Sequence, residues 1–251
     1  MNHSPYNLSE LGPSDMINLV SVSILSGIIF FIVYWFFISS PTTTLYFKKR
    51  YTEKWASIGQ FLFQKGLGFT CLGVLPLIIC LNVEPTSGLS EYGLGINPDM
   101  VGYSFRWFAI ISVTAIPLVI WRSKQPKNLE KYPQIRWPRW DVKIALINIA
   151  GWALYLLGYE LLFRGIFLFP LAEHLGVSTA IAINIALYAA THIPKGLDET
   201  IGSFFLGLVL CVLTLTSGMI WIAFGIHFIV AMTNSFTALR YHPGITFNNR
   251  W

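Results

Sequence analysis

Long apolar stretches separated by shorter polar segments dominate this chain. The first stretch, residues 16–39, contains no charged residue, and Tyr34 and Trp35 near its end are typical of a membrane interface. A helix of this length, rising about 1.5 Å per residue, crosses a hydrocarbon core roughly 30 Å thick. Six more stretches have the same character: residues 66–83, 103–121, 144–171, 178–193, 201–216 and 219–239. The pattern therefore predicts an all-α polytopic membrane protein with about seven transmembrane helices.

The segment between the first two stretches, residues 46–65, has a different pattern. Basic side chains alternate there with aromatic ones, as in Lys54–Trp55 and Phe63–Lys65. Such a mixture is typical of an amphipathic helix at the membrane surface. We expect an interfacial helix that leads into the second membrane-spanning helix.

Composition supports a membrane protein and excludes an ordinary soluble domain. Only 12% of the 251 residues are charged and 54% are hydrophobic, whereas soluble domains carry roughly 25% charged residues. The three cysteines all fall in apolar stretches without a paired spacing, so they are expected to be small buried hydrophobes.

The charges predict the orientation of the chain. Two basic loops, after the first and third stretches, hold eleven cations: Lys48, Lys49, Arg50, Lys54, Arg122, Lys124, Lys127, Lys131, Arg136, Arg139 and Lys143. Such loops stay cytoplasmic. The opposite segments are acidic, with Glu10, Asp15, Glu84, Glu91 and Asp99. We expect a multi-pass protein of a bacterial cytoplasmic (inner) membrane with its N-terminus outside and its C-terminus inside, where Arg240 and Arg250 lie. Lipid explains the net charge of +5, and no nucleic-acid partner is expected.

A few ionisable residues lie inside the stretches, where they are costly and so indicate function. They are Glu160 and Arg164 in the fourth stretch, His192 in the fifth and His227 in the seventh. Glu160 and Arg164 are four residues apart, so they share one helix face and can pair. The pair has either a functional role or a purely structural one as a neutralised ion pair.

Helix geometry predicts that Glu160 and His192 are neighbours. If the fourth and fifth stretches form an antiparallel hairpin with its apex near Leu175, both residues lie roughly 22 to 26 Å from the turn. His227 is expected near the middle of the membrane. Two imidazoles and one carboxylate suit either a zinc-like divalent metal bound by Glu160, His192 and His227, or direct activation of water. Both routes lead to hydrolysis, and no GxSxG-type nucleophile motif is present.

At these residues the chain resembles the CPBP family, the CAAX-protease and bacteriocin-processing membrane proteins also called Abi proteins. The resemblance covers about residues 152–239. Three motifs carry it: Tyr159-Glu160-Leu161-Leu162-Phe163-Arg164-Gly165, Tyr188-Ala189-Ala190-Thr191-His192 and His227-Phe228-Ile229-Val230-Ala231.

The resemblance implies a CPBP-type bundle of seven to eight helices around an intramembrane cavity where water is activated to cleave peptide bonds. It implies a division into N-terminal helices and basic loop (1–143), a motif-bearing core (144–240) and a tail (241–251). In an enzyme of this kind, Glu160 would polarise water or ligate a metal and His192 would share that task. His227 would bind the oxyanion or complete the metal site, and Arg164 would orient Glu160.

Two positions depart from the family motifs. Tyr159 replaces the first of two adjacent glutamates, the residue most often assigned as the base, and a phenol is a poor base at neutral pH. Ala231 replaces an asparagine expected to hydrogen-bond the oxyanion, although Asn234 lies on nearly the same face one turn further on.

Two functions therefore stay open. The first is an intramembrane endopeptidase that cleaves prenylated CAAX proteins or membrane peptides. The second is a non-catalytic assembly, immunity or regulatory factor that binds a lipidated or transmembrane peptide or protein in the same cavity. Membrane lipid surrounds the protein in both.

Overall fold

The computed structural model describes residues 18–248 and contains seven helices long and apolar enough to cross a membrane. Met16, Glu10, Asp15 and Arg250, used in the predictions above, lie outside the described residues. The seven are α2 (Leu19–Ser39); α4 (Glu53–Gly68) continued by a π-helix (Phe69–Val74) and α5 (Leu75–Val83); α6 (Pro98–Ser123); α8 (Val142–Glu160) continued by a π-helix (Leu161–Phe167) and α9 (Leu168–Leu175); α10 (Val177–Ala190) with a 3-10 turn (Ile193–Lys195); α11 (Leu197–Ser217); and α12 (Trp221–Tyr241). The predicted all-α polytopic fold is confirmed.

Shorter elements connect these helices. They are α3 (Pro41–Arg50), a 3-10 turn (Leu89–Tyr92), α7 (Pro126–Leu129), β1 (Arg139–Trp140) and β2 (Thr246–Phe247). The two strands pair in parallel, with Arg139 opposite Thr246. This pairing, which the sequence pattern did not predict, ties the end of the chain to the segment that leads into α8.

Local polar contacts explain where several helices begin and end. The Asn18 side chain accepts a hydrogen bond from the Ser21 N–H at 2.8 Å and caps α2, and Asp141 caps α8 by accepting from the Ile144 N–H at 2.8 Å. Gly176 separates α9 from α10 with a φ of +83°, a value that side chains disfavour. The hairpin apex predicted near Leu175 is therefore confirmed.

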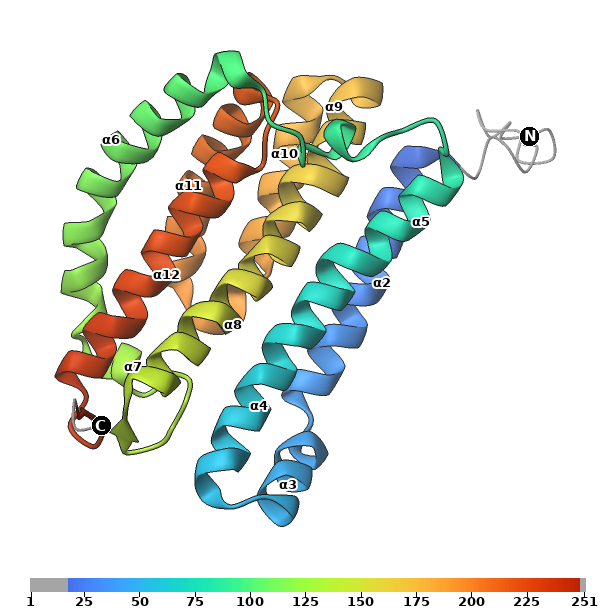
Figure 1. Ribbon diagram of the computed structural model, residues 1–251. Coiled ribbons are helices and arrows are strands. Elements are labelled where there is room, and N and C mark those ends of the chain that lie inside the picture. The colour runs from blue at the N-terminus through green and yellow to red at the C-terminus, as the bar shows by residue number, and fades with distance from the viewer. Residues whose placement is uncertain (1–17, 249–251) are drawn as a thin grey trace, which may run out of the picture.

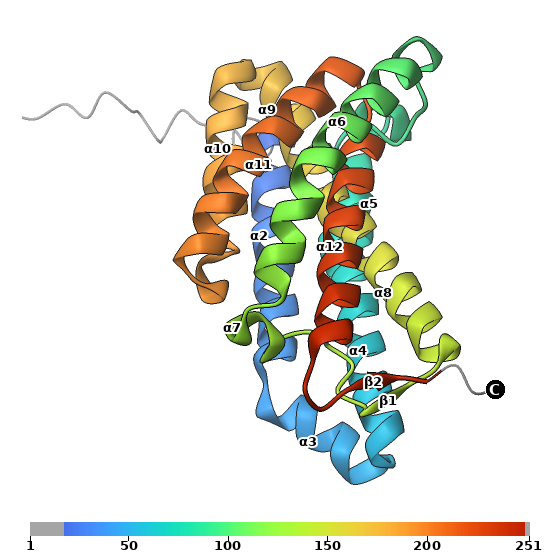
Figure 2. The same cartoon turned by 90° about the vertical axis from the view of Figure 1, so that its left-hand side faces the viewer.

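The long helices form a bundle in which the α8–α9 run is central (Figures 1 and 2). This run packs against α4 and its π-helix on one side and α12 on another, and α12 in turn packs against α6. The basic loops, with α3 and α7, lie at one end of the bundle, and the α9–α10 turn lies at the opposite end (Figure 1). Both basic loops thus lie at the same end of the bundle, as expected if basic loops stay on one side of the membrane.

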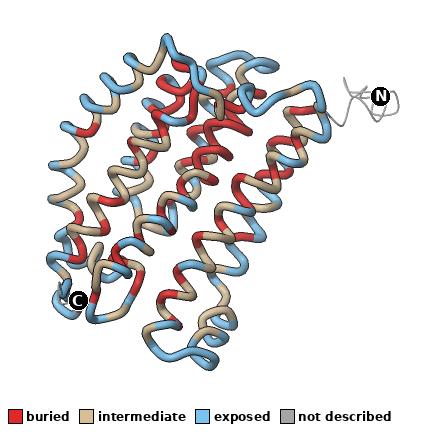
Figure 3. Tube along the Cα trace, viewed as in Figure 1, coloured by how far each residue is buried: buried red, intermediate tan, exposed pale blue. Residues whose placement is uncertain are grey.

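Burial is concentrated along the α8–α9 run, whereas α6 is largely exposed or intermediate (Figure 3). All seven residues of the second π-helix are buried. On α6, Phe105 and Val113 are among the most exposed apolar residues, at 69% and 73%. Apolar exposure of this extent on a spanning helix indicates contact with lipid.

The predicted interfacial helix over residues 46–65 differs from the structure. The helical conformation is interrupted at Tyr51 and Thr52, where α3 ends and α4 begins. From α4 the helix then continues through the π-helix and α5 to Val83. Ile58 and Phe61 of α4 are buried, because this face packs against α8 rather than lying on a membrane surface. Periodicity alone does not distinguish a helix face that packs against another helix from one that lies on a membrane surface.

Candidate functional site

Glu160 and Arg164 form an ion pair in the central α8–α9 run. Arg164 Nη1 lies 3.2 Å from Glu160 Oε2, and neither side chain is exposed. Glu160 ends α8 and Arg164 lies in the following π-helix, a helix form frequent at functional sites. The guanidinium carbon of Arg164 also lies 4.1 Å from the centroid of the Tyr188 ring. The predicted i,i+4 pairing is confirmed, and these two opposite charges face each other.

His227 on α12 binds the other oxygen of the same carboxylate. His227 Nδ1 lies 2.6 Å from Glu160 Oε1. A carboxylate paired with a guanidinium only accepts hydrogen bonds, so Nδ1 is the donor. In the neutral ring, the lone pair is therefore on Nε2. Glu160 thus determines both the tautomer and the orientation of His227.

His192 follows α10, and a backbone carbonyl orients its ring as Glu160 orients the ring of His227. Its Nδ1 lies 3.0 Å from the Tyr188 carbonyl oxygen, which can only accept, so His192 Nδ1 is also a donor. The Thr191 hydroxyl lies 3.2 Å from the same nitrogen. A neutral His192 consequently also has its lone pair on Nε2, so the site contains two imidazoles in the same tautomer.

Tyr159, which replaces the motif glutamate, lines the smaller cavity together with both histidines. Its hydroxyl lies 2.7 Å from Thr191 Oγ1, and Thr191 donates its single hydroxyl proton to the Tyr188 carbonyl oxygen. The Tyr159 phenol is therefore the donor to Thr191. The ring centroids of Tyr159 and His227 are 5.6 Å apart. A buried aromatic donor thus occupies the place where the motif has a carboxylate.

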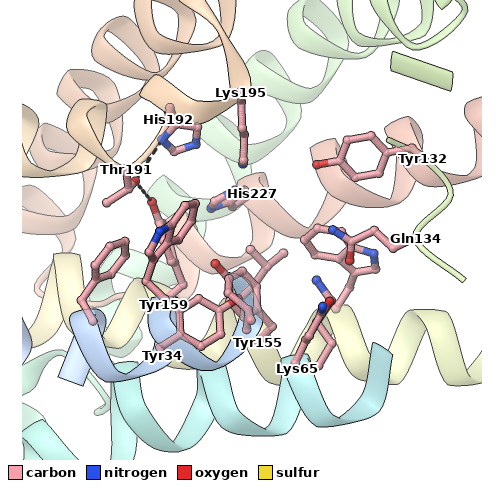
Figure 4. Close-up of a pocket in the computed structure, with 16 residues that line it drawn as sticks. Tyr34, Lys65, Tyr132, Gln134, Tyr155, Tyr159, Thr191, His192, Lys195 and His227 are labelled. Carbon is pink, nitrogen blue, oxygen red and sulfur yellow. Dashed lines mark hydrogen bonds between the residues drawn. The ribbon is translucent and has the colours of Figure 1, made fainter. Parts of the chain in front are cut away.

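Two cavities meet at the histidines. The first, about 160 Å³, lies among α2, α4, α8 and the loop after α7; Tyr159, His192 and His227 line it (Figure 4). The second, about 510 Å³, lies among α6, α11 and α12, and the same two histidines line it. Its other walls include Leu118, Leu206 and Val230, so it joins an apolar space to the polar site.

The structure brings the four predicted site residues together. His192 and His227 both pack against the Tyr188 ring, with centroid separations of 5.0 and 6.4 Å. Glu160 lies behind His227, is fully buried and lines neither cavity. The carboxylate therefore acts on the cavity only through His227.

The predicted three-ligand metal site does not fit this arrangement. Within residues 18–248, no group of three His, Cys, Asp or Glu side chains could hold a metal ion. Glu160 Oε1 is bonded to His227 Nδ1, and Oε2 faces Arg164. Both oxygens of Glu160 are thus already engaged, which leaves none to complete a metal site with His192.

Ala231 in the third motif provides no side-chain hydrogen-bond donor at the position where the family motif has an asparagine. Ala231 lines the larger cavity, and so does Asn234, one turn further along α12. The Asn234 amide oxygen accepts a hydrogen bond from the Ser123 hydroxyl at 2.7 Å. This contact holds the Asn234 side chain in the cavity wall, and its amide N–H groups are hydrogen-bond donors.

Two cavity residues, Lys65 and Lys195, were missed by the sequence analysis. Both line the smaller cavity with the histidines. Lys65 was assigned to an interfacial helix, whose lysines normally extend to water. Extending the second apolar stretch back to Glu53, where the helix begins, would have placed Lys65 well inside a spanning helix and marked it as an intramembrane cation.

Comparison with known proteins supports the resemblance seen in the motifs. Residues 141–233 match a family model described as "Type II CAAX prenyl endopeptidase Rce1-like". A search of curated proteins and a search of solved structures found no match. The matched segment contains Glu160, Arg164, His192 and His227. These residues thus lie in a segment that matches an Rce1-like domain, within a chain whose described residues include seven helices able to cross a membrane.

Proposed function

We propose that this protein is an intramembrane endopeptidase that hydrolyses a peptide bond near the C-terminus of a lipid-anchored or transmembrane peptide. The observation that carries the proposal is His227, which a fully buried Glu160–Arg164 pair holds with one nitrogen bonded and the rest of its ring lining both cavities. An ion pair completely removed from water is costly. The orientation of His227 at the cavities is a functional reason for such a pair to be present.

In the proposed reaction, His227 is the base in place of the missing glutamate. His227 Nε2 accepts a proton from water as the water oxygen adds to the carbonyl carbon, and Glu160 stabilises the resulting imidazolium. His192 Nε2 accepts a hydrogen bond from the second O–H of the water and so orients the nucleophile, and that proton stays on the oxygen. The carbon–nitrogen bond then breaks, and His227 returns its proton to the departing amine.

The larger cavity suits the anchored part of the substrate. Its apolar residues on α6 and α11 form a space of about 510 Å³ that leads to the histidines. A prenyl chain or an apolar peptide segment placed there would bring a neighbouring amide bond to His192 and His227. Membrane lipid surrounds the remaining apolar surface.

A cleavage assay tests this function directly. The purified protein in lipid nanodiscs is incubated with a prenylated peptide, and products are identified by mass spectrometry. His227→Gln should slow cleavage at least 100-fold, since general base catalysis contributes about 10²- to 10⁴-fold. His174→Gln is the matched control, because His174 bonds the Pro170 carbonyl and lines neither cavity. Equal rates for both variants would refute the proposed base.

A non-catalytic binding role is the second candidate, and Tyr159 favours it. The phenol that replaces the motif glutamate donates its proton to Thr191 and gives the cavity no carboxylate. The protein would then bind a lipidated or transmembrane segment as an assembly, immunity or regulatory factor. In the same assay, binding of the prenylated peptide without any cleavage by the unmodified protein would support this role.

We also propose a cytoplasmic-membrane location with the N-terminus outside and the C-terminus inside. The clustering of the basic loops at one end of the bundle supports it (Figure 1). The two cavities would then open towards the cytoplasmic half of the membrane, since Tyr132 of the second basic loop lines both.

A further inference from the structure

Lys65 is a buried lysine surrounded by aromatic rings. Its side chain comes from α4 with 3% of the residue exposed, and its Nζ lies 3.2 Å from the Trp152 ring centroid, 4.5 Å from that of Tyr155 and 5.3 Å from that of Phe61. Among the described residues, Lys65 makes neither a salt bridge nor a hydrogen bond to a carboxylate. When protonated, it is a buried cation without an anion.

Ring contacts do not fully compensate such a charge. A cation–π contact contributes about 0.5 to 2 kcal/mol, whereas removing an ammonium from water costs several kcal/mol. The Glu160–Arg164 pair shows how this protein compensates a charge elsewhere in the membrane. The arrangement around Lys65 is therefore suited to an anion that comes from outside the chain.

A second lysine faces the same space. Lys195 follows His192 and approaches the smaller cavity from the side opposite Lys65 (Figure 4). Gln134 adds an amide to the lining, and none of the described residues that line this cavity is an aspartate or a glutamate. Two lysines, two side-chain amides (Gln64 and Gln134) and no acidic group line the smaller cavity, so its charge suits an anion.

The geometry points to the free C-terminal carboxylate of the substrate peptide as the anion bound between Lys65 and Lys195. The inference rests on the proposed function and adds how the substrate is recognised. The two cavities share His192, His227 and Lys195, so one molecule can extend from one to the other past the histidines. An apolar anchor in the larger cavity would place a short C-terminal segment next to the lysines. The smaller cavity holds about 160 Å³, enough for a carboxylate and its hydration but not for a folded partner.

Binding affinity tests this inference separately from catalysis. The ligand is a prenylated peptide whose scissile amide is N-methylated against hydrolysis, prepared as the free acid and as the C-terminal amide. Binding to the full-length protein is measured in phosphatidylcholine nanodiscs. We expect the free acid to bind at least tenfold more tightly than the amide. In Lys65→Met the acid should lose this advantage while the affinity for the amide stays unchanged.

Two further variants keep the test decisive. Lys195→Met changes a half-buried residue and should also reduce the preference for the acid, even if Lys65→Met folds poorly. Lys124→Met is the matched control. Lys124 Nζ also lies near an aromatic ring, 4.6 Å from the Tyr241 ring centroid, but Lys124 lines neither cavity. Lys124→Met should keep the full preference.

Distinct outcomes overturn the inference or the proposed function. Equal affinity of acid and amide, or equal weakening of both ligands by Lys65→Met, would overturn the carboxylate site. Competition by phosphatidylglycerol in the unmodified protein but not in Lys65→Met would assign the lysines to a lipid phosphate instead. A preference for the acid without any cleavage of the unmethylated peptide would support the carboxylate site and reject the endopeptidase.

Discussion

His227 Nδ1 and Glu160 Oε1 lie 2.6 Å apart, although the two residues come from different helices, α12 and α8. The carboxylate accepts this hydrogen bond on one oxygen and faces Arg164 with the other. Charge, tautomer and ring orientation are thereby linked in one buried chain of three groups. A change at any of them is expected to affect the other two.

The first prediction concerns the stability of this buried chain. Arg164→Met leaves the Glu160 carboxylate buried without its cation, which should destabilise the protein by about 3 to 5 kcal/mol. Glu160→Gln should be similarly harmful, because it leaves the guanidinium unpaired. The double variant removes both charges and should be more stable than the sum of the single effects predicts, as measured by thermal unfolding in detergent. Strictly additive losses would show that the two charges do not stabilise each other.

Hydrophobic length and charge placement were sufficient to predict the spanning helices, since a bilayer requires long uncharged helices whatever their neighbours. Helix periodicity likewise predicted the Glu160–Arg164 pair, and the gap between the fourth and fifth apolar stretches predicted the hairpin apex near Leu175. Contacts between distant segments were not predictable in this way. The direction of the Glu160 carboxylate depends on His227, and the aromatic surroundings of Lys65 depend on how α4 packs against α8. Such contacts between distant helices depend on how the complete fold packs, and no local pattern in a single sequence predicts them.

A second prediction concerns the close approach of α8 to the first π-helix. A Cβ atom built on Gly158 would lie 2.7 Å from Phe69 Cα, a backbone atom that cannot rotate away. Gly158→Ala should therefore cost about 1 to 3 kcal/mol and move the adjacent Tyr159 and Glu160. Thermal unfolding and the cleavage assay should both show the loss.

Gly66→Ala is the matched control for this substitution. Gly66 also lies in a helix, but a Cβ there meets nothing within 4 Å. Alanine has the higher helix propensity, so this variant should be neutral or stabilised by up to ~1 kcal/mol. If Gly66→Ala is destabilised as much as Gly158→Ala, the effect is not due to helix contact.

A third prediction concerns pH and the start of α8. The Ile144 N–H that donates to Asp141 holds the pKa of this carboxyl below its ordinary value, and nearby Lys54 acts in the same direction. Because the folded pKa is the lower one, the ionised cap stabilises the protein above the unfolded pKa of about 3.9. This contribution is lost as pH falls through the folded pKa.

The unfolding temperature of the unmodified protein and of Asp141→Asn, measured between about pH 6 and pH 2.5, checks this effect. Asparagine also caps a helix but does not titrate, so the variant should lose less stability below about pH 4. Parallel curves for the two proteins would exclude Asp141 as a source of acid sensitivity. Asp141→Ala should lose about 1 kcal/mol at neutral pH.

A fourth prediction concerns orientation in the membrane. Thr86 in the loop after α5 and Lys127 in the short helix α7 are exposed at opposite ends of the bundle. Because Cys71, Cys80 and Cys211 are buried, cysteines introduced at these two positions should dominate labelling. An impermeant maleimide should label Thr86→Cys in intact cells and Lys127→Cys only after permeabilisation. Labelling of both from the same side would contradict the seven-helix topology, and the reverse pattern would invert the orientation.

The last prediction restores the two motif residues that this chain lacks. Tyr159→Glu would place a carboxylate in the smaller cavity beside His227, and Ala231→Asn would add an amide donor to the larger one. A carboxylate base and an oxyanion donor each contribute about 10²-fold or more to hydrolysis, so the double variant should cleave the prenylated peptide at least 100-fold faster than the unmodified protein. Tyr159→Phe is the control, because it removes only the hydrogen bond to Thr191 and should change the rate less than threefold if His227 is the base. A correctly inserted double variant with no gain in rate would mean that the cavity does not hold the scissile bond between His192 and His227. Abolished cleavage in Tyr159→Phe would instead place the phenol among the catalytic groups.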